Sequence, residues 1–438
     1  MTTTTFSSRR HILIVAQAFI VSLASRNYVS NAFAPELLSK HPYFVRQLRQ
    51  DHGTTTSRSS SLHMAKTTKK KNSGSSSTGL KGFGSVGGGS ASSTSVSHVA
   101  LDRSKEARAF YDFLEKGNAG DNLSRCALGF FPISKDFQLR GVIALKPIKR
   151  GDVIIRIPYE LAVNLGQEGA DPTLPAVELL RDYCQTMLSD GAEKEAYYRM
   201  LPAFGGEDCM GSTDFFSDEA LEALQSPLIV EETLKRREKV QTRFQLDVAT
   251  DDTFPTWIDG NPVTAQHLLW AVWLITSRVL TVQGNAEEGK SYRLLIPFLD
   301  MCNHDRSSSH ILTGRAESGG ELKVVAGSNV KKGDAIDICY GGGMAGNDRF
   351  LQDYGFLDDG SDHKAYNMVA QQLLGKRRIV EGIGAGRFLS EPDRIKSLEE
   401  LGKTSVQDDQ NILQSLTEPS MKSALKYRIG IKEALVRN

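Results

Sequence analysis

Three polar residues that follow an apolar run are the first candidates for chemistry in this chain. Asp300, Asn303 and His304 fall within one turn of backbone. They follow Leu294 to Ile296, a run typical of a buried strand, and Pro297 makes the chain leave the sheet because proline cannot donate to a strand ladder. Such a turn can hold backbone amides and an imidazole rigidly against a ligand. A helix start capped by Asp300 explains the same residues, so both interpretations stay open here.

A buried arginine is the second candidate. Arg278 lies in a segment, His267 to Leu280, that is apolar on nearly all sides, which predicts a buried helix over Thr264 to Val282 with Thr264 as its N-cap. A buried guanidinium is costly unless it meets an anion or a carbonyl. Arg278 is therefore either a ligand-binding residue or one half of a structural pair with a carboxylate.

Two tyrosines lie on either side of a run of three glycines. Tyr340 follows an expected strand, Ala335 to Cys339, and leads into Gly341 to Gly343, and Tyr354 comes after a short helical segment. Consecutive glycines let another chain or a ligand approach the backbone closely. A tyrosine at a strand end is usually a packing residue, but two of them around this loop, downstream of the Asn-His turn, form a candidate site.

Short strands and longer helices are expected to position these residues. Two β-branched runs between Phe137 and Pro158, joined by a Lys-Arg-Gly-Asp turn, predict a first hairpin, and a similar phrase from Val324 to Tyr340 predicts a second. The two hairpins bracket a middle that is expected to be mostly helical. The helices expected there are Leu174 to Leu188, Glu193 to Met200, Asp218 to Phe244 with an interruption at Pro227, and Thr264 to Val282.

The chain changes character near residue 98. Residues 1–98 contain twelve Lys or Arg and two acidic residues, and residues 99–438 carry a net charge of −9. An acidic folded part argues against nucleic acid as the partner. The five cysteines form no CxxC pair and no Cys/His cluster, so neither a disulfide framework nor a metal site is expected. A helix from Leu101 to Leu114 is expected to open the folded part.

The first 98 residues have the composition of a targeting leader. Arg9 and Arg10 precede an apolar stretch, Ile12 to Ala24, that is too short to span a membrane, which predicts a signal peptide over residues 1–32. Residues 33–98 are rich in Ser, Thr and Gly and basic, as in organelle transit segments. In tandem they resemble the bipartite leaders of algae with secondary plastids. A mature plastid protein without a membrane segment is expected, and a secreted protein with a disordered stalk is the alternative.

The order of five short motifs resembles the SET-domain protein methyltransferases. The motifs are Gly141-Val142, Ser277-Arg278, the Pro-x-x-Asp-x-x-Asn-His from Pro297 to His304, Tyr340-Gly341 and Tyr354-Gly355-Phe356. The combination is specific, although each motif alone is weak. It covers roughly Phe137 to Asp358 and is similar to the Rubisco large-subunit lysine methyltransferase group, whose SET domain is split by a helical insertion.

This resemblance implies an α+β fold in which a β-rich SET domain is interrupted by helices and followed by a small helical domain. The expected segments are a helical lead-in (99–136), the first SET part (137–170), the insertion (171–290), the second SET part (291–358) and a short helical domain similar to a substrate-binding domain (359–438).

The resemblance also implies a donor, a substrate and roles for individual residues. S-adenosyl-L-methionine would be the methyl donor, and a lysine side chain of a protein would be the acceptor. Tyr340 stands at the catalytic position, and the carbonyls of Ser277 and Asp300 would surround the transferring methyl group. The residues implied in donor binding are Arg140, Gly141, Arg278, Asn303, His304 and Tyr354.

The resemblance implies methylation of a lysine in a protein, and the leader adds the expectation of a non-histone, plastid substrate. A monomer is expected. No cysteine-rich zinc segments flank the domain, unlike many histone-directed relatives. A protein-histidine N-methyltransferase is a related alternative. A SET-derived binding module without turnover is an alternative of another class, suggested by Leu139, which stands where the family usually has glycine. Retention of Asn303, His304, Tyr340 and Tyr354 argues against that module.

Overall fold

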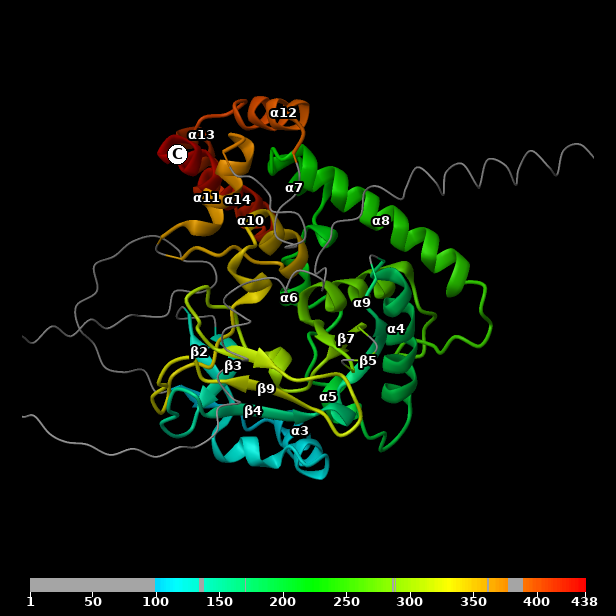
Figure 1. Ribbon diagram of the computed structural model, residues 1–438. Helices are drawn as coiled ribbons and strands as arrows, with labels where there is room; N and C mark the ends of the chain where they lie inside the picture. The colour runs from blue at the N-terminus through cyan, green and yellow to red at the C-terminus, as the bar shows by residue number, and fades with distance from the viewer. Residues whose placement is uncertain are drawn as a thin grey trace, which may run out of the picture.

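The computed structural model describes residues 99–133, 138–169, 171–285, 287, 289–360, 362–376 and 389–438. The fold is α+β, as expected, with three small sheets at one end of the molecule and a group of C-terminal helices at the other (Figure 1). The expected leader lies outside the described residues, so its two segments stay predictions.

The β-rich part of the chain consists of three antiparallel sheets of three strands each. The strands are β1 (Ala100–Leu101), β2 (Cys126–Pro132), β3 (Gln138–Ala144), β4 (Val153–Pro158), β5 (Val163–Gln167), β6 (Leu280–Gln283), β7 (Ser291–Leu295), β8 (Ile311–Thr313) and β9 (Glu321–Val325). Their orders are β1-β2-β3, β4-β9-β8 and β5-β7-β6. Strands from before and after the helical middle therefore share two of the three sheets.

The two predicted hairpins do not form. Strands β3 and β4 lie where strands were expected, but β3 pairs with β2 and β4 pairs with β9. Strand β2 was not anticipated, because its segment was read as part of a helical lead-in. The segment Ala335 to Cys339 is not a strand: it forms isolated bridges, Ala335 with Ile143 and Ile338 with His304. Strand partners are decided by burial and cross-strand packing, which a local turn does not encode.

The expected helices of the middle form with small changes at their ends. The described helices in the first half of the chain are α3 (Lys105–Lys116), which lies before the middle, α4 (Thr173–Leu188), α5 (Glu195–Tyr198), α6 (Glu207–Met210), which was not expected, and α7 (Asp218–Ala223). They are followed by α8 (Pro227–Asp247) and α9 (Ala265–Arg278). The helix predicted to reach Val282 ends at Arg278, because the residues after it pair with β7 as strand β6. No helix of the described segments combines the length and apolarity needed to cross a membrane.

Helix α9 lies in the main hydrophobic core. Its residues from Leu268 to Ile275 are all buried, and α4 and α8 pack against it. Strands β3, β4, β7 and β9 contribute side chains to the same core. An all-round apolar helix is the form expected at such a position. This helix places Ser277 and Arg278 at its last turn, facing the candidate site.

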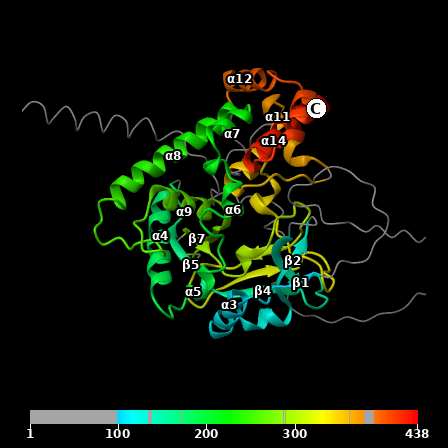
Figure 2. The same ribbon diagram turned by 180° about the vertical axis from the view of Figure 1, so that it is seen from behind.

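A second core joins part of the helical middle to the C-terminal helices. Those helices are α11 (Lys364–Leu373), α12 (Glu391–Leu401), α13 (Val406–Ser415) and α14 (Pro419–Arg437). Helix α7 and Ile229 of α8 contribute to this core together with α11 and α14. Both views show α8 running from these helices along the outside of the molecule toward α4 (Figure 2). The helical middle is thus divided between two cores.

A buried ion cluster holds the C-terminal helices together. The carboxylate of Asp409 lies 2.6 Å from Arg428 Nη2 and 2.7 Å from Lys432 Nζ. Arg428 Nη1 also donates to the carbonyl of Ala223 at 2.9 Å. Because Ala223 belongs to α7, the cluster links α13 and α14 to the helical middle.

Candidate active site

The turn after β7 places its backbone in an unusual conformation. Phe298 has a φ of 70° and is fully buried. A positive φ is uncommon outside glycine, so packing of this ring in the main core must hold it. Asp300 follows in a three-residue 3-10 helix, η6 (Leu299–Met301), and its Oδ2 accepts a hydrogen bond from Tyr197 Oη at 2.7 Å. The capped-helix interpretation is therefore wrong, because the Asp300 carboxylate binds a tyrosine rather than helix amides.

Asn303 joins the turn to strand β3. Its Nδ2 donates to the carbonyl of Arg140 at 3.1 Å. Gly141, the next residue, has no room for a side chain, since a β-carbon there would lie 2.3 Å from Asn303 Nδ2. Three of the residues singled out from the sequence are thus brought into one contact.

His304 lies between this turn and the segment that carries Tyr340. Its Nδ1 accepts a hydrogen bond from the backbone N–H of Tyr340 at 3.0 Å. A neutral imidazole that accepts at Nδ1 carries its proton on Nε2. That Nε2 is buried, has no hydrogen-bond partner among the described residues, and lies 3.7 Å from Asp358 Oδ2. The imidazole ring also packs against Phe350, with centroids 4.7 Å apart.

Arg278 meets a carbonyl, which is one of the two kinds of partner, an anion or a carbonyl, that can offset the cost of burying a guanidinium. Its Nη1 donates to the carbonyl of Asp300 at 3.0 Å, while its Nε is buried without a hydrogen-bond partner in the described part of the chain. Burial raises the pKa of Asp300 to about 6, although Arg278 and the Tyr197 hydroxyl act to lower it. Burial and the nearby Arg278 lower the pKa of Arg140, whose Nη2 donates to the carbonyl of Met200 at 2.6 Å. Two guanidiniums therefore lie near one buried carboxyl group.

The two tyrosines lie against each other. The rings of Tyr340 and Tyr354 stack with centroids 5.1 Å apart and planes at 27°. Tyr340 Oη donates to the carbonyl of Cys302 at 2.6 Å. Burial raises the pKa of both hydroxyl groups. Both therefore stay protonated near neutral pH, so neither is suited to act as a base there, and each oxygen keeps lone pairs for further contacts.

Ser277 contributes its backbone to the same region. Its hydroxyl donates to the carbonyl of Trp273 at 2.7 Å, inside α9. The last four carbonyls of a helix have no partner within the helix, and the Ser277 carbonyl is one of these. The Asp300 carbonyl accepts from Arg278 but has a second lone pair. Both carbonyls can therefore accept another weak donor.

The structure adds residues that sequence reasoning missed. Tyr197 holds the carboxylate of Asp300, and Arg306 binds Asp358 with Nε 2.7 Å from Oδ2. Arg306 lies two residues after His304, so its proximity to the motif was the only available signal. Nothing local marked Tyr197 or Asp358, because their partners are distant in the sequence.

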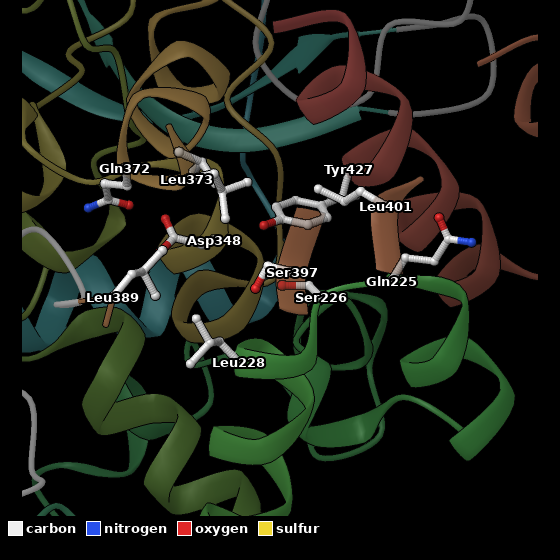
Figure 3. Close-up of a pocket in the computed structure, with 11 residues that line it drawn as sticks. Gln225, Ser226, Leu228, Asp348, Gln372, Leu373, Leu389, Ser397, Leu401 and Tyr427 are labelled. Atoms are coloured by element: carbon white, nitrogen blue, oxygen red, sulfur yellow. The ribbon is translucent and has the colours of Figure 1, made fainter. Parts of the chain in front are cut away.

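No group of His, Cys, Asp or Glu within the described segments could hold a metal ion. A small cavity lies elsewhere, between the start of α8 and the C-terminal helices, where Ser226, Leu228, Leu373, Leu401 and Tyr427 line it (Figure 3). Its volume of about 20 Å³ has room for roughly one water molecule. This cavity is therefore too small for a substrate, and the candidate active site is the region around Tyr340.

The comparison with a family model defines the class of domain. Residues 139–341 match the family model described as SET domain. This match and the curated relatives confirm the expected resemblance to SET-domain methyltransferases of the Rubisco large-subunit group.

Two kinds of chloroplast enzyme are among the curated relatives. The chain is 24% identical over 257 residues to the ribulose-1,5 bisphosphate carboxylase/oxygenase large subunit N-methyltransferase, chloroplastic, of Pisum sativum. It is 24% identical over 246 residues to the [fructose-bisphosphate aldolase]-lysine N-methyltransferase, chloroplastic, of Arabidopsis thaliana. Each match covers 53% of this chain and 48% of the relative. The chain therefore spans about half the length of the curated relatives it matches.

Solved structures share the fold. The SET domain of LSMT bound to lysine and AdoHcy has a TM-score of 0.53 at 16% identity, covering 77% of this chain and 90% of that chain. Rubisco LSMT bound to AdoMet has a TM-score of 0.51 at 16% identity, covering 76% and 90%. The likeness at these identities concerns the arrangement of the elements.

Proposed function

We propose that this chain is a protein-lysine N-methyltransferase that uses S-adenosyl-L-methionine and acts on a non-histone protein of a plastid. The observation that carries the proposal is the pair of contacts made by adjacent residues, Asn303 with the backbone of Arg140 and His304 with the backbone of Tyr340. These contacts place the proposed donor-binding turn directly beside the proposed catalytic tyrosine. Methyl transfer needs the donor and the acceptor to be aligned, and the direct contacts of Asn303 and His304 can maintain this alignment.

The side chains suit a donor that carries an amino-acid carboxylate. Arg278 Nε is a buried donor without a partner among the described residues, and a guanidinium is well suited to a carboxylate. Arg140 and Arg278 together outweigh the charge of Asp300, whose raised pKa favours its neutral form at lower pH. Gly141 is buried and leaves room for the Asn303 side chain beside the backbone of β3, which a larger residue would not. When bound, S-adenosylmethionine supplies a methyl group on a positively charged sulfur.

The residues of this chain contribute alignment and environment. Transfer to an amine is an in-line displacement without a covalent enzyme intermediate, so catalysis consists mainly of positioning. The oxygen of Tyr340 and the carbonyls of Ser277 and Asp300 would accept weak C–H hydrogen bonds from the methyl group as charge develops. A lysine has a pKa of about 10.4 in water, and partly buried aromatic walls such as Tyr340 and Tyr354 favour its neutral, nucleophilic form by desolvation.

The partner and the location are parts of the same proposal. The curated relatives are described as chloroplastic, which supports a plastid, and their names give protein substrates. The C-terminal helices together with α7 would bind the substrate protein, because they form a separate core beside the SET domain. We propose a monomer without nucleic acid as a partner, in keeping with the net charge of −9 over residues 99–438.

The full chain, incubated with radiolabelled S-adenosylmethionine and a plastid extract, tests this function. Label on a protein lysine supports the proposal. Label on a protein histidine would favour the related histidine enzyme instead, and label only in nucleic acid or small molecules would overturn protein methylation. Isothermal titration with S-adenosylmethionine separates the binding-module alternative, since that alternative requires no donor binding.

A further inference from the structure

Arg306, which the proposed reaction does not use directly, makes three short polar contacts beside the site and a longer one from Nη1 to Met368 Sδ at 3.6 Å. Its Nε lies 2.7 Å from Asp358 Oδ2, its Nη1 2.6 Å from the Gly343 carbonyl and its Nη2 2.7 Å from the Ala345 carbonyl. The guanidinium also lies 5.4 Å from the ring centroid of Phe350. Only 11% of this side chain is exposed. A guanidinium with its donors directed at three acceptors fixes their relative positions more strictly than an ammonium could.

The loop that Arg306 contacts has little conformational preference of its own. Gly341, Gly342 and Gly343 have φ values of 58°, 59° and 76°, a region that other residues avoid. Glycine loses more conformational freedom on ordering than any other residue. The loop begins at Tyr340, so disorder in the glycines would move the tyrosine. The two carbonyls bound by Arg306 belong to Gly343, the last of these glycines, and to Ala345, two residues further on.

The opposite end of the Arg306 contact is also firmly held. The backbone N–H of Asp358 donates a hydrogen bond to Asn347 Oδ1 at 2.7 Å, and Asn347 is fully buried. Burial alone would raise the pKa of Asp358, but His304 and Arg306 lower it to about 2. The Asp358 carboxylate is therefore charged at any working pH. It lies 3.7 Å from His304 Nε2, so it contacts both the proposed donor-binding turn and Arg306.

We propose that Arg306 is a positioning residue that fixes the loop Gly341 to Gly343, keeps Tyr340 on the Cys302 carbonyl and, through Asp358, ties this loop to His304. The role of Tyr340 in turnover rests on the proposed function. The contacts of Arg306 with Asp358 and with the Gly343 and Ala345 carbonyls, which we call the clamp, do not rest on the proposed function, because their effect on the loop can be measured without turnover. A purely structural ion pair, which stabilises the fold without ordering this loop, is the competing explanation.

Two full-length variants and one control test the clamp. The variants are Arg306→Gln and Arg306→Lys, and the control is Arg315→Gln. Arg315 also binds a glycine carbonyl, that of Gly284 at 2.8 Å, but in the loop between β6 and β7. Amide hydrogen exchange of residues 339–346 is the first measurement, and kcat with the Kd for S-adenosylmethionine is the second. All three variants are assayed at a temperature where their melting curves show them folded.

We expect the amide hydrogens of residues 339–346 to exchange faster in both Arg306 variants. In Arg315→Gln their exchange should stay unchanged. In Arg306→Gln kcat falls by roughly 100-fold, because misplacement of a catalytic group by about 1 Å has an effect of that size. The Kd for S-adenosylmethionine stays within about threefold, as for a loss confined to the transition state. Methylguanidinium added to Arg306→Gln restores part of kcat, which a role in global stability alone would not produce.

Loop exchange and kcat that both match Arg315→Gln would overturn the clamp. So would a lower melting temperature in Arg306→Gln with unchanged loop exchange in the folded state, since that result describes a structural ion pair. If the unmodified chain shows no turnover, the proposed function fails, while the exchange comparison still decides the role of Arg306.

Discussion

Asn303 and Gly141 lie in direct contact, so that a β-carbon at position 141 would be only 2.3 Å from Asn303 Nδ2. A side chain there would push Asn303 away from the Arg140 carbonyl, its partner at 3.1 Å. The contact joins β3 to the turn after β7. The two parts of the region that matches the SET domain model, which the helical middle separates in the sequence, therefore meet at the proposed donor site.

Gly141→Ala is expected to weaken the binding of S-adenosylmethionine by tenfold or more, roughly 1.4 kcal/mol, because Asn303 cannot keep its place. Isothermal titration measures the change in Kd. Gly169→Ala is the matched control, since a β-carbon there has nothing within 4 Å. An unchanged Kd in Gly141→Ala would show that the Asn303 contact is not part of the donor site.

Tyr340→Phe is expected to abolish most turnover and to leave the Kd for S-adenosylmethionine nearly unchanged. The substitution removes only the hydroxyl that binds the Cys302 carbonyl at 2.6 Å, at a stability cost of about 1 kcal/mol. Single-turnover methylation and titration of the donor separate the two effects. Tyr159→Phe, which removes a hydroxyl bonded to Asn164, serves as the control. A fully active Tyr340→Phe enzyme would remove Tyr340 from the catalytic role.

Asp300 is expected to make stability depend on pH in a defined direction. Burial raises its pKa from 3.8 to about 6, so the folded state favours the neutral carboxyl. The resulting stabilisation is complete below the unfolded pKa and is lost as the pH rises through about 6, a change of up to roughly 3 kcal/mol. Asn cannot titrate, so the stability advantage of the wild type over Asp300→Asn should shrink between about pH 4 and pH 7. Melting curves of both proteins across this range provide the measurement, and a difference that stays constant would contradict it.

Asp409→Ala is expected to destabilise the C-terminal helices by about 3–5 kcal/mol, because it leaves the buried Arg428 and Lys432 without their shared carboxylate. Glu400→Ala removes a carboxylate from a more exposed pair with Lys403 and should cost less than about 1 kcal/mol. Thermal unfolding compares the two. Equal effects would mean that the Asp409 cluster is not what holds α13 and α14 to α7.

Several helices and the motif residues could be read from the sequence for physical reasons that act locally. The all-round apolar pattern from His267 to Leu280 predicted a buried helix, and α9 has that burial. Pro227 was expected to interrupt a helix, and α8 begins at this residue. The predicted end of α9 was too late, because Leu280 to Gln283 are compatible with a helix and with a strand. Pairing with β7 makes these residues a strand.

Strand pairing and side-chain partners were not readable in the same way. The turn residues between β3 and β4 favoured a hairpin, but both strands found better partners far along the chain. The interpretation of Asp300 as a helix cap could be rejected only when Tyr197 was seen to hold its carboxylate. The contact of Arg278 with the Asp300 carbonyl was likewise not predicted, and its role in donor binding stays a prediction.

By itself, the sequence determined the helices of the middle, the glycines around Tyr340 and the set of motif residues, because periodicity and turn chemistry depend on residues a few positions apart. Only the tertiary structure decided that Asn303 lies on Gly141 and that Arg306 reaches both Asp358 and the glycine loop. Such contacts join residues from segments that meet only when the cores close. Their energies depend on burial and geometry that no local stretch of sequence contains.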